Sequence, residues 1–411
     1  MREVVLPSHS RISRVVALLL TAVLLVLTVR TGLGFMFARA APPVAYRIDW
    51  NNPEVLAAQA DYLVRTATTK AATRDIADLA MRAVAGGPLS PFAVRNYGFA
   101  VLAQGKAAQA KPVLAVAGRV SLRDFLAHAW LLEDRRRAKD AAGAVYHADI
   151  MMRQRTSSYE QVLPIMVGLL ADQKTIAPMA AALKRDPVWR LPFLNEMGGD
   201  GENLLNKLDL LNALKRQGSP ASDAEMAPVF RQAWSKINPR TLRARWDQLV
   251  TLPDGARAGL LIDGDFEHPN VPPPFSWSYY PNREVYAEVS RRSGAGRALF
   301  ASFDGTRSVS FAGQQLLLSP GRYRLTGAVL AEDKVEAGQF RWTLSCGRNG
   351  GVRDTVATAP LRPRLGEWSR FAATFTVPKD CTEQQLWLSA IPADPADVAS
   401  LWVDNLSLQA F

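Results

Sequence analysis

The stretch LIDGDFEHPNVPPPFSWSYY, at residues 261–280, combines acidic side chains with aromatic rings. Carboxylates stand at 263, 265 and 267, and after a run of prolines Phe275, Trp277 and Tyr279 occupy every second position. Alternate residues of a β-strand point to one face of the sheet, so the spacing predicts three rings on one face. Such a face is either a hydrophobic core or a platform for a ligand.

The residues that commonly perform catalysis form no known motif. Of the four histidines, His9 and His268 stand far apart, and His128 and His147 fall in segments expected to be helical. The chain has no G-x-S-x-G, H-E-x-x-H, P-loop or strand-linked G-x-G-x-x-G sequence. Paired carboxylates are arranged in space rather than in sequence, so an envelope enzyme with such a site stays open as an alternative. We expect a protein that is not an enzyme.

The net charge of +11 is unevenly distributed. Residues 258–411 carry 15 Lys and Arg against 16 Asp and Glu, and residues 1–39 carry five against one, so most of the excess lies between them. The basic residues there are scattered and not interleaved with aromatic ones, so we expect no nucleic-acid partner. A solvated basic surface explains the charge, and it would also tolerate anionic partners such as acidic glycans or lipid head groups.

The N-terminus predicts export. Residues 15–29, VVALLLTAVLLVLTV, form an unbroken apolar run, and a small-x-small triplet follows at 38–40. These features are typical of a cleaved signal peptide, which would leave a periplasmic or secreted protein. However, residues 15–38 reach the roughly 20 residues of a membrane span if Arg30 extends to the interface. We favour an uncleaved anchor: residues 1–40 form a basic cytoplasmic tail and one inner-membrane helix, and the bulk of the chain is periplasmic.

The two cysteines, Cys346 and Cys381, both lie in the C-terminal part of the chain. In an oxidising compartment two such cysteines most simply form a disulfide with each other. A metal or catalytic pair is the alternative, but the one histidine of this half, His268, is far away in sequence.

The sequence predicts a helical domain over residues 52–250, with linkers at 41–51 and 251–259 on either side. Apolar residues recur at intervals of three and four, and proline and glycine fall mainly in short breaks. Within it, KAAQAKPVLAVA from Lys106 and DAAGAVYHADIM from Asp140 align at an offset of 34 residues.

A 34-residue period of paired helices resembles tetratricopeptide repeats. Tyr97-Gly98 takes the place of the family's Leu-Gly pair, and Ala110 and Ala144 take that of its small residue, which lets two helices approach closely. The second copy departs from the pattern, with Leu132 where glycine is expected. An irregular helical bundle is the alternative. A repeat array would offer a surface to a protein partner and no catalytic machinery.

Residues 260–411 predict an antiparallel β-sandwich or jelly roll. Short alternating runs such as RALFASF, RYRLTGAVLA and SRFAATFTV are divided by turn sequences such as SPGR and EAGQ. The opening IDGDFE, the central QQLLLSPGRYRLTG, then GEWSRFAATFTVP and the closing LWVDNLSL follow in that order. This order resembles the carbohydrate-binding jelly rolls of cellulases and xylanases, which are related to the galactose-binding-like fold. The fold class is therefore a helical-repeat array followed by a jelly roll, behind an N-terminal membrane anchor.

The resemblance implies a structural calcium ion that ties the first strand to the last. The matching carboxylates are Glu267 in the opening motif and Asp404 in the closing one, with backbone carbonyls near Gly264 completing a shell of oxygens.

The resemblance also implies glycan binding through aromatic rings. Because the first strand of a sandwich normally packs inward, we expect Phe275 and Trp277 to be core. The glycan-binding candidates are then Tyr280, Tyr286 and Trp342. The remaining tryptophans of the alternating strands predict sheet packing: Trp368, Trp387 and Trp402.

The combined prediction is a membrane-anchored envelope scaffold. Its helical repeats bind a protein partner and its jelly roll contacts cell-surface or secreted polysaccharide. A purely protein–protein adaptor that binds no glycan is the main alternative.

Overall fold

The computed structural model describes residues 11–66, 70–199, 202–234, 236–292, 295–347, 354–393 and 398–411. Its internal contacts divide the chain into two compact units, Met1–Val162 and Leu163–Phe411. Helices come first and two antiparallel sheets follow, which confirms the predicted fold class. The tetratricopeptide type of the helical array stays a prediction.

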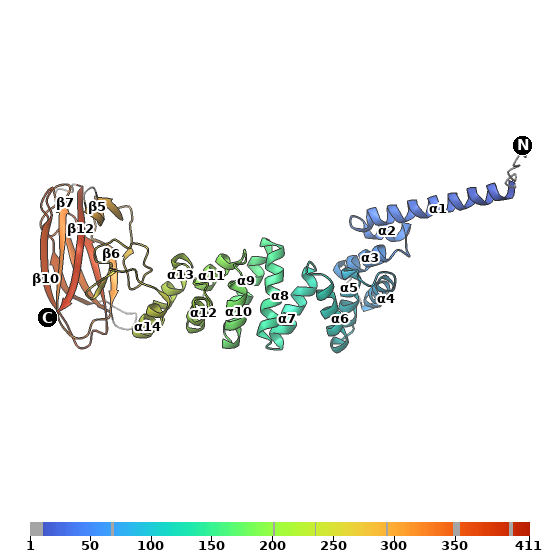
Figure 1. The fold of residues 1–411 in the computed structure, drawn as a ribbon, viewed down its shortest axis with the longest axis horizontal. Helices are drawn as coiled ribbons and strands as arrows, with labels where there is room; N and C mark the ends of the chain where they lie inside the picture. The colour runs from blue at the N-terminus through green and yellow to red at the C-terminus, as the bar shows by residue number, and fades with distance from the viewer. Residues whose placement is uncertain are drawn as a thin grey trace, which may run out of the picture. The chain divides into compact units, whose positions relative to one another are not determined.

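The described part of the first unit is helical. Its helices are α1 (Arg11–Ala38), α2 (Pro42–Ile48), α3 (Pro53–Thr66), α4 (Lys70–Gly86), α5 (Pro91–Ala103), α6 (Ala107–Val120), α7 (Phe125–Arg137), α8 (Ala141–Gln154) and the short η1 (Thr156–Ser158). Along the chain, α3 packs with α4, α5 with α6, and α7 with α8 (Figure 1). Asp124 and Asp140 cap the N-termini of α7 and α8. Each side chain accepts a hydrogen bond from a backbone amide of the first turn that has no partner within the helix.

Helix α1 is the one helix in the described ranges that is long and apolar enough to cross a membrane, over Val15–Ala38. Its C-terminal end packs on α2 and α3. There Arg30 forms an ion pair of 2.8 Å with the buried Asp49 and lies over the ring of Trp50. Gly34 permits this approach, since a Cβ on it would stand 2.8 Å from Cβ of Asp49. Arg30 therefore contacts the folded body of the unit.

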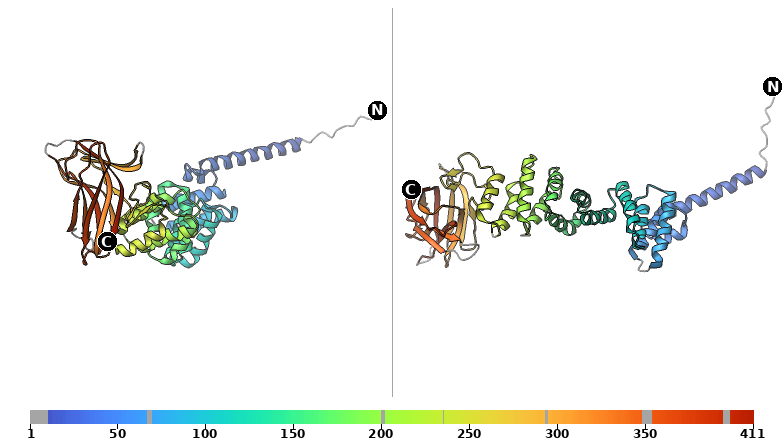
Figure 2. Two further views of the ribbon diagram at one scale, coloured as in Figure 1. Left: turned by 60° about the vertical axis from the view of Figure 1, so that its left-hand side comes forward. Right: turned by 90° about the horizontal axis from the view of Figure 1, so that it is seen from below.

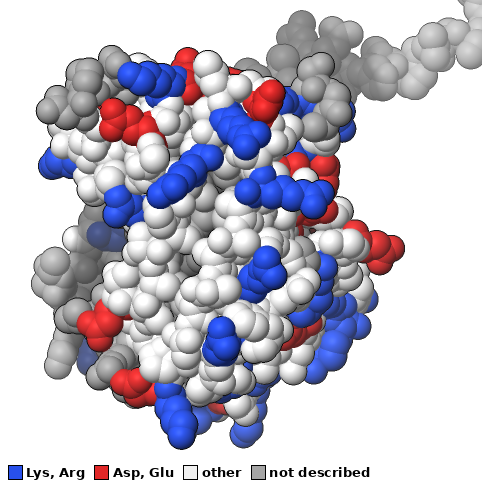
Figure 3. All heavy atoms as spheres, turned by 90° about the vertical axis from the view of Figure 1, so that its left-hand side faces the viewer, with Lys and Arg blue, Asp and Glu red and all other residues white. Residues whose placement is uncertain are grey.

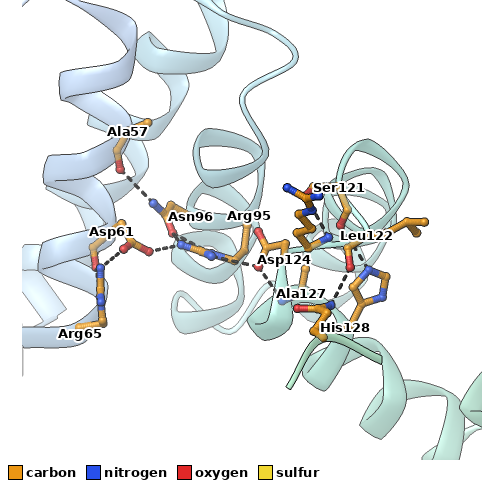
Figure 4. A network of polar contacts seen from close by, with 12 residues as sticks. Ala57, Asp61, Arg65, Arg95, Asn96, Ser121, Leu122, Asp124, Ala127 and His128 are labelled. Atoms are coloured by element: carbon orange, nitrogen blue, oxygen red, sulfur yellow. Dashed lines mark hydrogen bonds and ion pairs between the residues drawn. The ribbon is translucent and has the colours of Figure 1, made fainter. Parts of the chain in front are cut away.

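A buried polar network joins three helices of the first unit (Figure 4). Arg95 on α5 donates to Asp61 on α3, and it donates at 3.0 Å to Asp124 at the start of α7. The Arg95 side chain is 4% exposed, so both ion pairs are shielded from water. The neighbouring Asn96 donates to the carbonyl of Ala57 on α3. A buried charge that loses its partner costs several kcal/mol. The network is therefore satisfied only when α3, α5 and α7 pack together in this arrangement.

The residues to which the repeat resemblance gave packing roles lie between paired helices. A Cβ on Gly98 would stand 2.7 Å from the side chain of Leu114 on α6, so glycine lets α5 and α6 approach closely. Ala110 and Ala144 are fully buried, and Tyr97 is partly buried and packs against the cluster that contains Ala110.

The second unit continues with helices. Helix α9 (Tyr159–Leu169) spans the division between the units, and the helices that follow are η2 (Gln173–Thr175), α10 (Ile176–Leu183), α11 (Arg190–Gly199), α12 (Leu204–Arg216), α13 (Asp223–Trp234) and α14 (Pro239–Leu249). Arg190 and Glu225 form a buried ion pair of 2.9 Å that ties α11 to α13.

Twelve strands follow in the described residues. They are β1 (Arg257–Ala258), β2 (Leu261–Ile262), β3 (Ser278–Tyr279), β4 (Val285–Arg292), β5 (Ala295–Phe303), β6 (Val309–Leu316), β7 (Gly321–Ala331), β8 (Phe340–Gly347), β9 (Asp354–Pro360), β10 (Ser369–Val377), β11 (Glu383–Ala390) and β12 (Ala399–Ala410). Sheet I has the order β10-β7-β12-β5-β4, and sheet II has the order β3-β6-β11-β8-β9. The two sheets lie face to face and form a sandwich (Figures 1 and 2).

The core of the sandwich comes from the inward residues of both sheets, among them Phe311 and Phe340 of sheet II and Leu325 and Leu401 of sheet I. The predicted disulfide is confirmed: Cys346 in β8 bonds to Cys381, just before β11, with a Cα–Cα distance of 5.5 Å. Both cysteines belong to the buried core, so the bond links neighbouring strands of sheet II.

Phe275 and Trp277 are both buried, as predicted, but they do not share a face. The ring of Phe275 packs against Trp234 of α13 and Trp246 of α14, with centroid distances of 5.9 and 5.8 Å. Trp277 instead packs inside the sandwich, 5.8 Å from the ring of Trp342. The expectation of one shared face was wrong because β3 includes only Ser278 and Tyr279, so strand alternation does not extend back to Phe275.

Candidate functional site

The structure separates the three predicted glycan-binding residues. Tyr280 directly follows β3 of sheet II and Tyr286 lies on β4 in sheet I, and each is 52% exposed. Trp342 is 1% exposed inside the sandwich core, so its ring cannot meet a glycan. This correction follows from alternation in β8, where Trp342 shares the inward face with Leu344.

The outer face of sheet II carries Tyr280 and polar side chains from its central strands. On β11, Gln385, Trp387 and Ser389 alternate with Leu386 and Leu388, which are in the core. The alternation turns the first three residues away from the other sheet. On β8, the same pattern turns Arg341, Thr343 and Ser345 outward.

Trp387 and Tyr280 form an aromatic pair on this face, with ring centroids 5.5 Å apart. Gly313 of β6 is paired directly opposite Trp387. A Cβ on Gly313 would stand 2.5 Å from Cε3 of the Trp387 ring, so the indole lies against the bare backbone of β6. The sequence alone had assigned Trp387 to sheet packing; the alternation of QLWLS with buried leucines was the signal that could have placed it outside.

Hydrogen-bonding groups stand in rows beside this pair. Trp387 is flanked on β8 by Thr343, and Gln385 is flanked by Gln315 on β6 and Ser345 on β8. The Gln385 Oε1 atom is buried and has no hydrogen-bond partner among the described residues. Aromatic rings beside amides and hydroxyls are the combination that receives the apolar faces and the hydroxyls of sugars. We call this surface the Tyr280–Trp387 face.

The outer face of sheet I carries a second group of rings. Trp402 of β12 packs 4.9 Å from Phe300 of β5, and Phe300 lies 6.3 Å from Tyr286. The guanidinium of Arg292 lies over Trp402 and over Trp368, 5.8 and 5.7 Å from their ring centroids. Of the tryptophans predicted to pack on the sheets, Trp402 does so, buried at 8% exposed on the outer side of sheet I, whereas Trp368 lies just before β10 and is 36% exposed. Figure 3, seen from the side where β7, β10 and β12 lie in Figure 1, shows more basic than acidic residues.

The predicted calcium residues lie near each other. Burial raises the pKa of Asp404 to about 6, and the charges of Asp265 and Glu267 add to this effect. Asp265 also has a buried oxygen without a hydrogen-bond partner in the described ranges. However, Glu267 accepts from the Arg297 amide at 2.7 Å and Asp404 from the Asn405 amide at 2.6 Å.

A cation would relieve the repulsion between these carboxylates. Yet the described part of the chain contains no group of three or more His, Cys, Asp or Glu side chains placed to hold a metal. Calcium at Glu267 and Asp404 stays a prediction.

A cleft of about 510 Å³ lies in the second unit between the last helices and the loop that opens the sandwich. Two carboxylates, of Asp223 and Glu267, line it together with His268 and Arg297. Partial burial raises the pKa of Asp223. Trp246 closes one side of the junction, because its Nε1 donates to the Pro272 carbonyl at 3.0 Å.

No family model matches the chain, and no curated protein matches it. Solved structures do match. A putative sugar-binding protein from Bacteroides thetaiotaomicron is 11% identical, with 37% of this chain and 100% of that chain covered and a TM-score of 0.29. The module TmCBM61, in complex with β-1,4-galactotriose, is 18% identical, with 38% and 100% covered and a TM-score of 0.25.

The enzymatically active domain of tailspike protein 4 from bacteriophage CBA120 is 11% identical to this chain, with 38% of this chain covered and a TM-score of 0.28. The match spans only 22% of the tailspike chain. With TM-scores this low, these likenesses assign no function to the chain.

Proposed function

We propose that the protein is a membrane-anchored, non-enzymatic envelope scaffold whose jelly roll binds polysaccharide through the Tyr280–Trp387 face. The observation that supports this most is the pair of the exposed Tyr280 and the half-buried Trp387, whose indole lies against the backbone of β6 at Gly313. Stacking on the rings would orient a sugar, and the hydroxyl of Thr343, beside Trp387 on β8, would bond to a sugar hydroxyl.

An uncleaved N-terminal helix is part of this proposal. The ion pair between Arg30 and the buried Asp49 joins α1 to the folded body, as does the packing of Gly34. Cleavage at the triplet 38–40 would remove both contacts and leave Asp49 without its cation. A retained helix keeps them and places the body next to the membrane on the exported side, where the disulfide would form.

The helical array would bind a protein partner and so connect it with the glycan. In the alternative, the protein is an adaptor between proteins and the sandwich binds no sugar. The two functions differ in one measurable property, namely the affinity of the folded chain for polysaccharides.

The test is electrophoresis of the detergent-solubilised full chain through native gels that contain bacterial or plant polysaccharides. We expect one or more glycans to retard the protein and Tyr280→Ala or Trp387→Ala to abolish the retardation. Tyr286→Ala is the matched control, because Tyr286 is equally exposed but lies on the opposite sheet.

Retention of binding in Tyr280→Ala with loss in Tyr286→Ala would move the site to sheet I. Absence of retardation by any glycan, with a folded protein, would support the adaptor.

An enzymatic function is a further alternative, because two carboxylates, of Asp223 and Glu267, line the cleft between the last helices and the sandwich. Glycoside hydrolysis uses two carboxylates on opposite sides of the bond that is cleaved. Release of reducing sugar by the wild type, lost in Asp223→Asn and in Glu267→Gln, would establish this activity. We expect no release from any glycan that the protein binds.

A further inference from the structure

A cavity of about 430 Å³ lies among α6, α7 and α8 of the first unit. Small residues form much of its wall: Ala115 and Gly118 of α6, and Ala142 and Gly143 of α8. A volume of this size is within the range of sites that hold small ligands or single side chains of a partner. Short side chains on both helices therefore leave room for an occupant.

Positively charged groups from different helices line this cavity. Arg119 comes from α6 and is exposed, with no ion-pair partner in the described part of the chain. Arg135 comes from α7 and pairs with Asp140 at 3.2 Å. That pair uses Nη1 of Arg135, and its Nε is buried without a hydrogen-bond partner among the described residues. One guanidinium is thus unpaired and the other is only partly satisfied.

Two residues of α8, Tyr146 and His147, also line the cavity, as does Asp140, whose carboxylate is the one paired with Arg135. The buried His147 is hydrogen-bonded through Nδ1 to Nδ1 of His128, at 2.9 Å. His128 Nε2 in turn lies 3.3 Å from the Ser121 carbonyl, which can only accept. If both rings are neutral, His128 donates to Ser121 and accepts from His147, which leaves His147 Nε2 as an unprotonated acceptor on the other side of its ring.

We propose that this cavity binds a carboxylate side chain of an acidic segment in a partner protein. The proposal rests on the partner-binding role proposed above and specifies its chemistry. Arg119 and Arg135 would pair with the carboxylate, because guanidinium groups form the strongest such contacts. The Tyr146 ring and the alanine and glycine wall would pack against the methylene groups of the same side chain.

A peptide suits the site better than an acidic sugar does. The wall between the charged groups is built from the methyl groups and backbone of Ala115, Gly118, Ala142 and Gly143, and it offers no amide side chain for sugar hydroxyls. The exposed aromatic ring, Tyr146, stands edge-on to His147, with an interplanar angle of 70°. The Tyr280–Trp387 face, by contrast, supplies both stacking rings and amides.

Binding at this site should be linked to protonation of His147. In the empty cavity the pKa of His147 is lowered to about 4 by burial first and then by the charges of His128 and Arg135, with Asp140 and Asp134 opposing them. Arg119 and Tyr146 also line the cavity beside the ring. A bound carboxylate would favour the imidazolium, so the complex should take up a proton and tighten as the pH falls.

The experiment measures fluorescence anisotropy of a labelled pentaglutamate peptide with the full chain in detergent, at pH 5.5 and 7.5. Unlabelled pentaglutamate, pentaglutamine and trigalacturonate serve as competitors. We expect pentaglutamate to bind more tightly at pH 5.5, and Arg119→Gln to weaken it about fivefold or more. Arg123→Gln is the matched control, because Arg123 is exposed nearby and does not line the cavity.

Ala142→Phe provides a second variant that keeps every charge and fills the cavity. Loss of binding in both Arg119→Gln and Ala142→Phe, with binding intact in Arg123→Gln, would support the site. Equal weakening in Arg119→Gln and Arg123→Gln would overturn it, because the peptide would then be held by net charge alone. Stronger competition by trigalacturonate than by unlabelled pentaglutamate would overturn the peptide assignment. None of these results depends on the Tyr280–Trp387 face, whose variants test the glycan proposal separately.

Discussion

Gly313→Ala should weaken glycan binding and leave the stability of the sandwich nearly unchanged. Gly313 lies inside β6 and has no positive φ, so alanine suits its backbone. Alanine in a strand interior restricts the unfolded chain, which stabilises a protein by about 0.5–1 kcal/mol when nothing is displaced. Here the new methyl group would stand 2.5 Å from Cε3 and 2.8 Å from Cζ3 of Trp387.

The displaced group is therefore the indole ring of the proposed site. Carbon atoms in contact are about 3.5 Å apart, so the ring must lift from β6 by roughly 1 Å. A gap or clash of that size forfeits about a quarter to a half of each dispersion contact with a sugar stacked on the ring. We expect glycan affinity to fall about tenfold, which corresponds to about 1.4 kcal/mol. Trp387 is at the surface, so the stability of the sandwich should change by less than about 1 kcal/mol.

The assay combines isothermal titration of the best-retarding oligosaccharide with urea unfolding of the same samples. The control is Gly321→Ala at the start of β7, where the nearest atom to an added Cβ is Cε2 of Tyr323, at 3.9 Å. Gly321→Ala should leave glycan affinity unchanged and raise the free energy of unfolding by at most about 1 kcal/mol. Wild-type affinity in Gly313→Ala would refute the assignment, since a ring that contacts sugar cannot be moved without an effect on binding.

Three further predictions concern stability. Burial, with the charge of Asp265 adding to it, raises the pKa of Asp263 to about 6 from 3.8, so this residue favours the folded state at acidic pH and the benefit is lost as the pH rises from about 4 to about 6. Asp263→Asn should therefore raise the unfolding free energy at pH 7, by at most about 3 kcal/mol, and have little effect at pH 4; urea unfolding at both values checks this. If the predicted calcium is bound, a chelator should lower the melting temperature of the sandwich at pH 7. An unchanged melting temperature would show that no calcium ion stabilises the sandwich. Arg95→Leu should cost about 3–5 kcal/mol in urea unfolding, because it leaves Asp124 buried without its cation and leaves Asp61 only the exposed Arg65, and a loss under about 1 kcal/mol would show that water reaches these carboxylates.

Local pattern in the sequence predicted much of the architecture. The change from intervals of three and four to strict alternation near residue 258 separated helices from strands, because each periodicity places apolar residues on one side of one kind of element. The long N-terminal helix and the disulfide could also be predicted from the sequence. The first follows from the length of an apolar run, and the second from the presence of two cysteines in one domain that is predicted to be exported. Tyr280 and Tyr286, two of the glycan-binding candidates, are both exposed.

Tertiary structure decided which of these residues meet. Alternation fixes the face of a side chain on its own strand, but the pairing order β3-β6-β11-β8-β9 decides that Trp387 lies against Gly313 and beside Tyr280, and it separates Tyr280 from Tyr286. Packing between the last helices and the sandwich turned Phe275 away from Trp277.

The same holds in the first unit, where His128 and His147, 19 residues apart, share a hydrogen bond beside a cavity. The sequence alone determined the elements and their faces, because those depend on neighbours along the chain. The sites depended on contacts between residues distant in sequence, which only the packing of those elements sets.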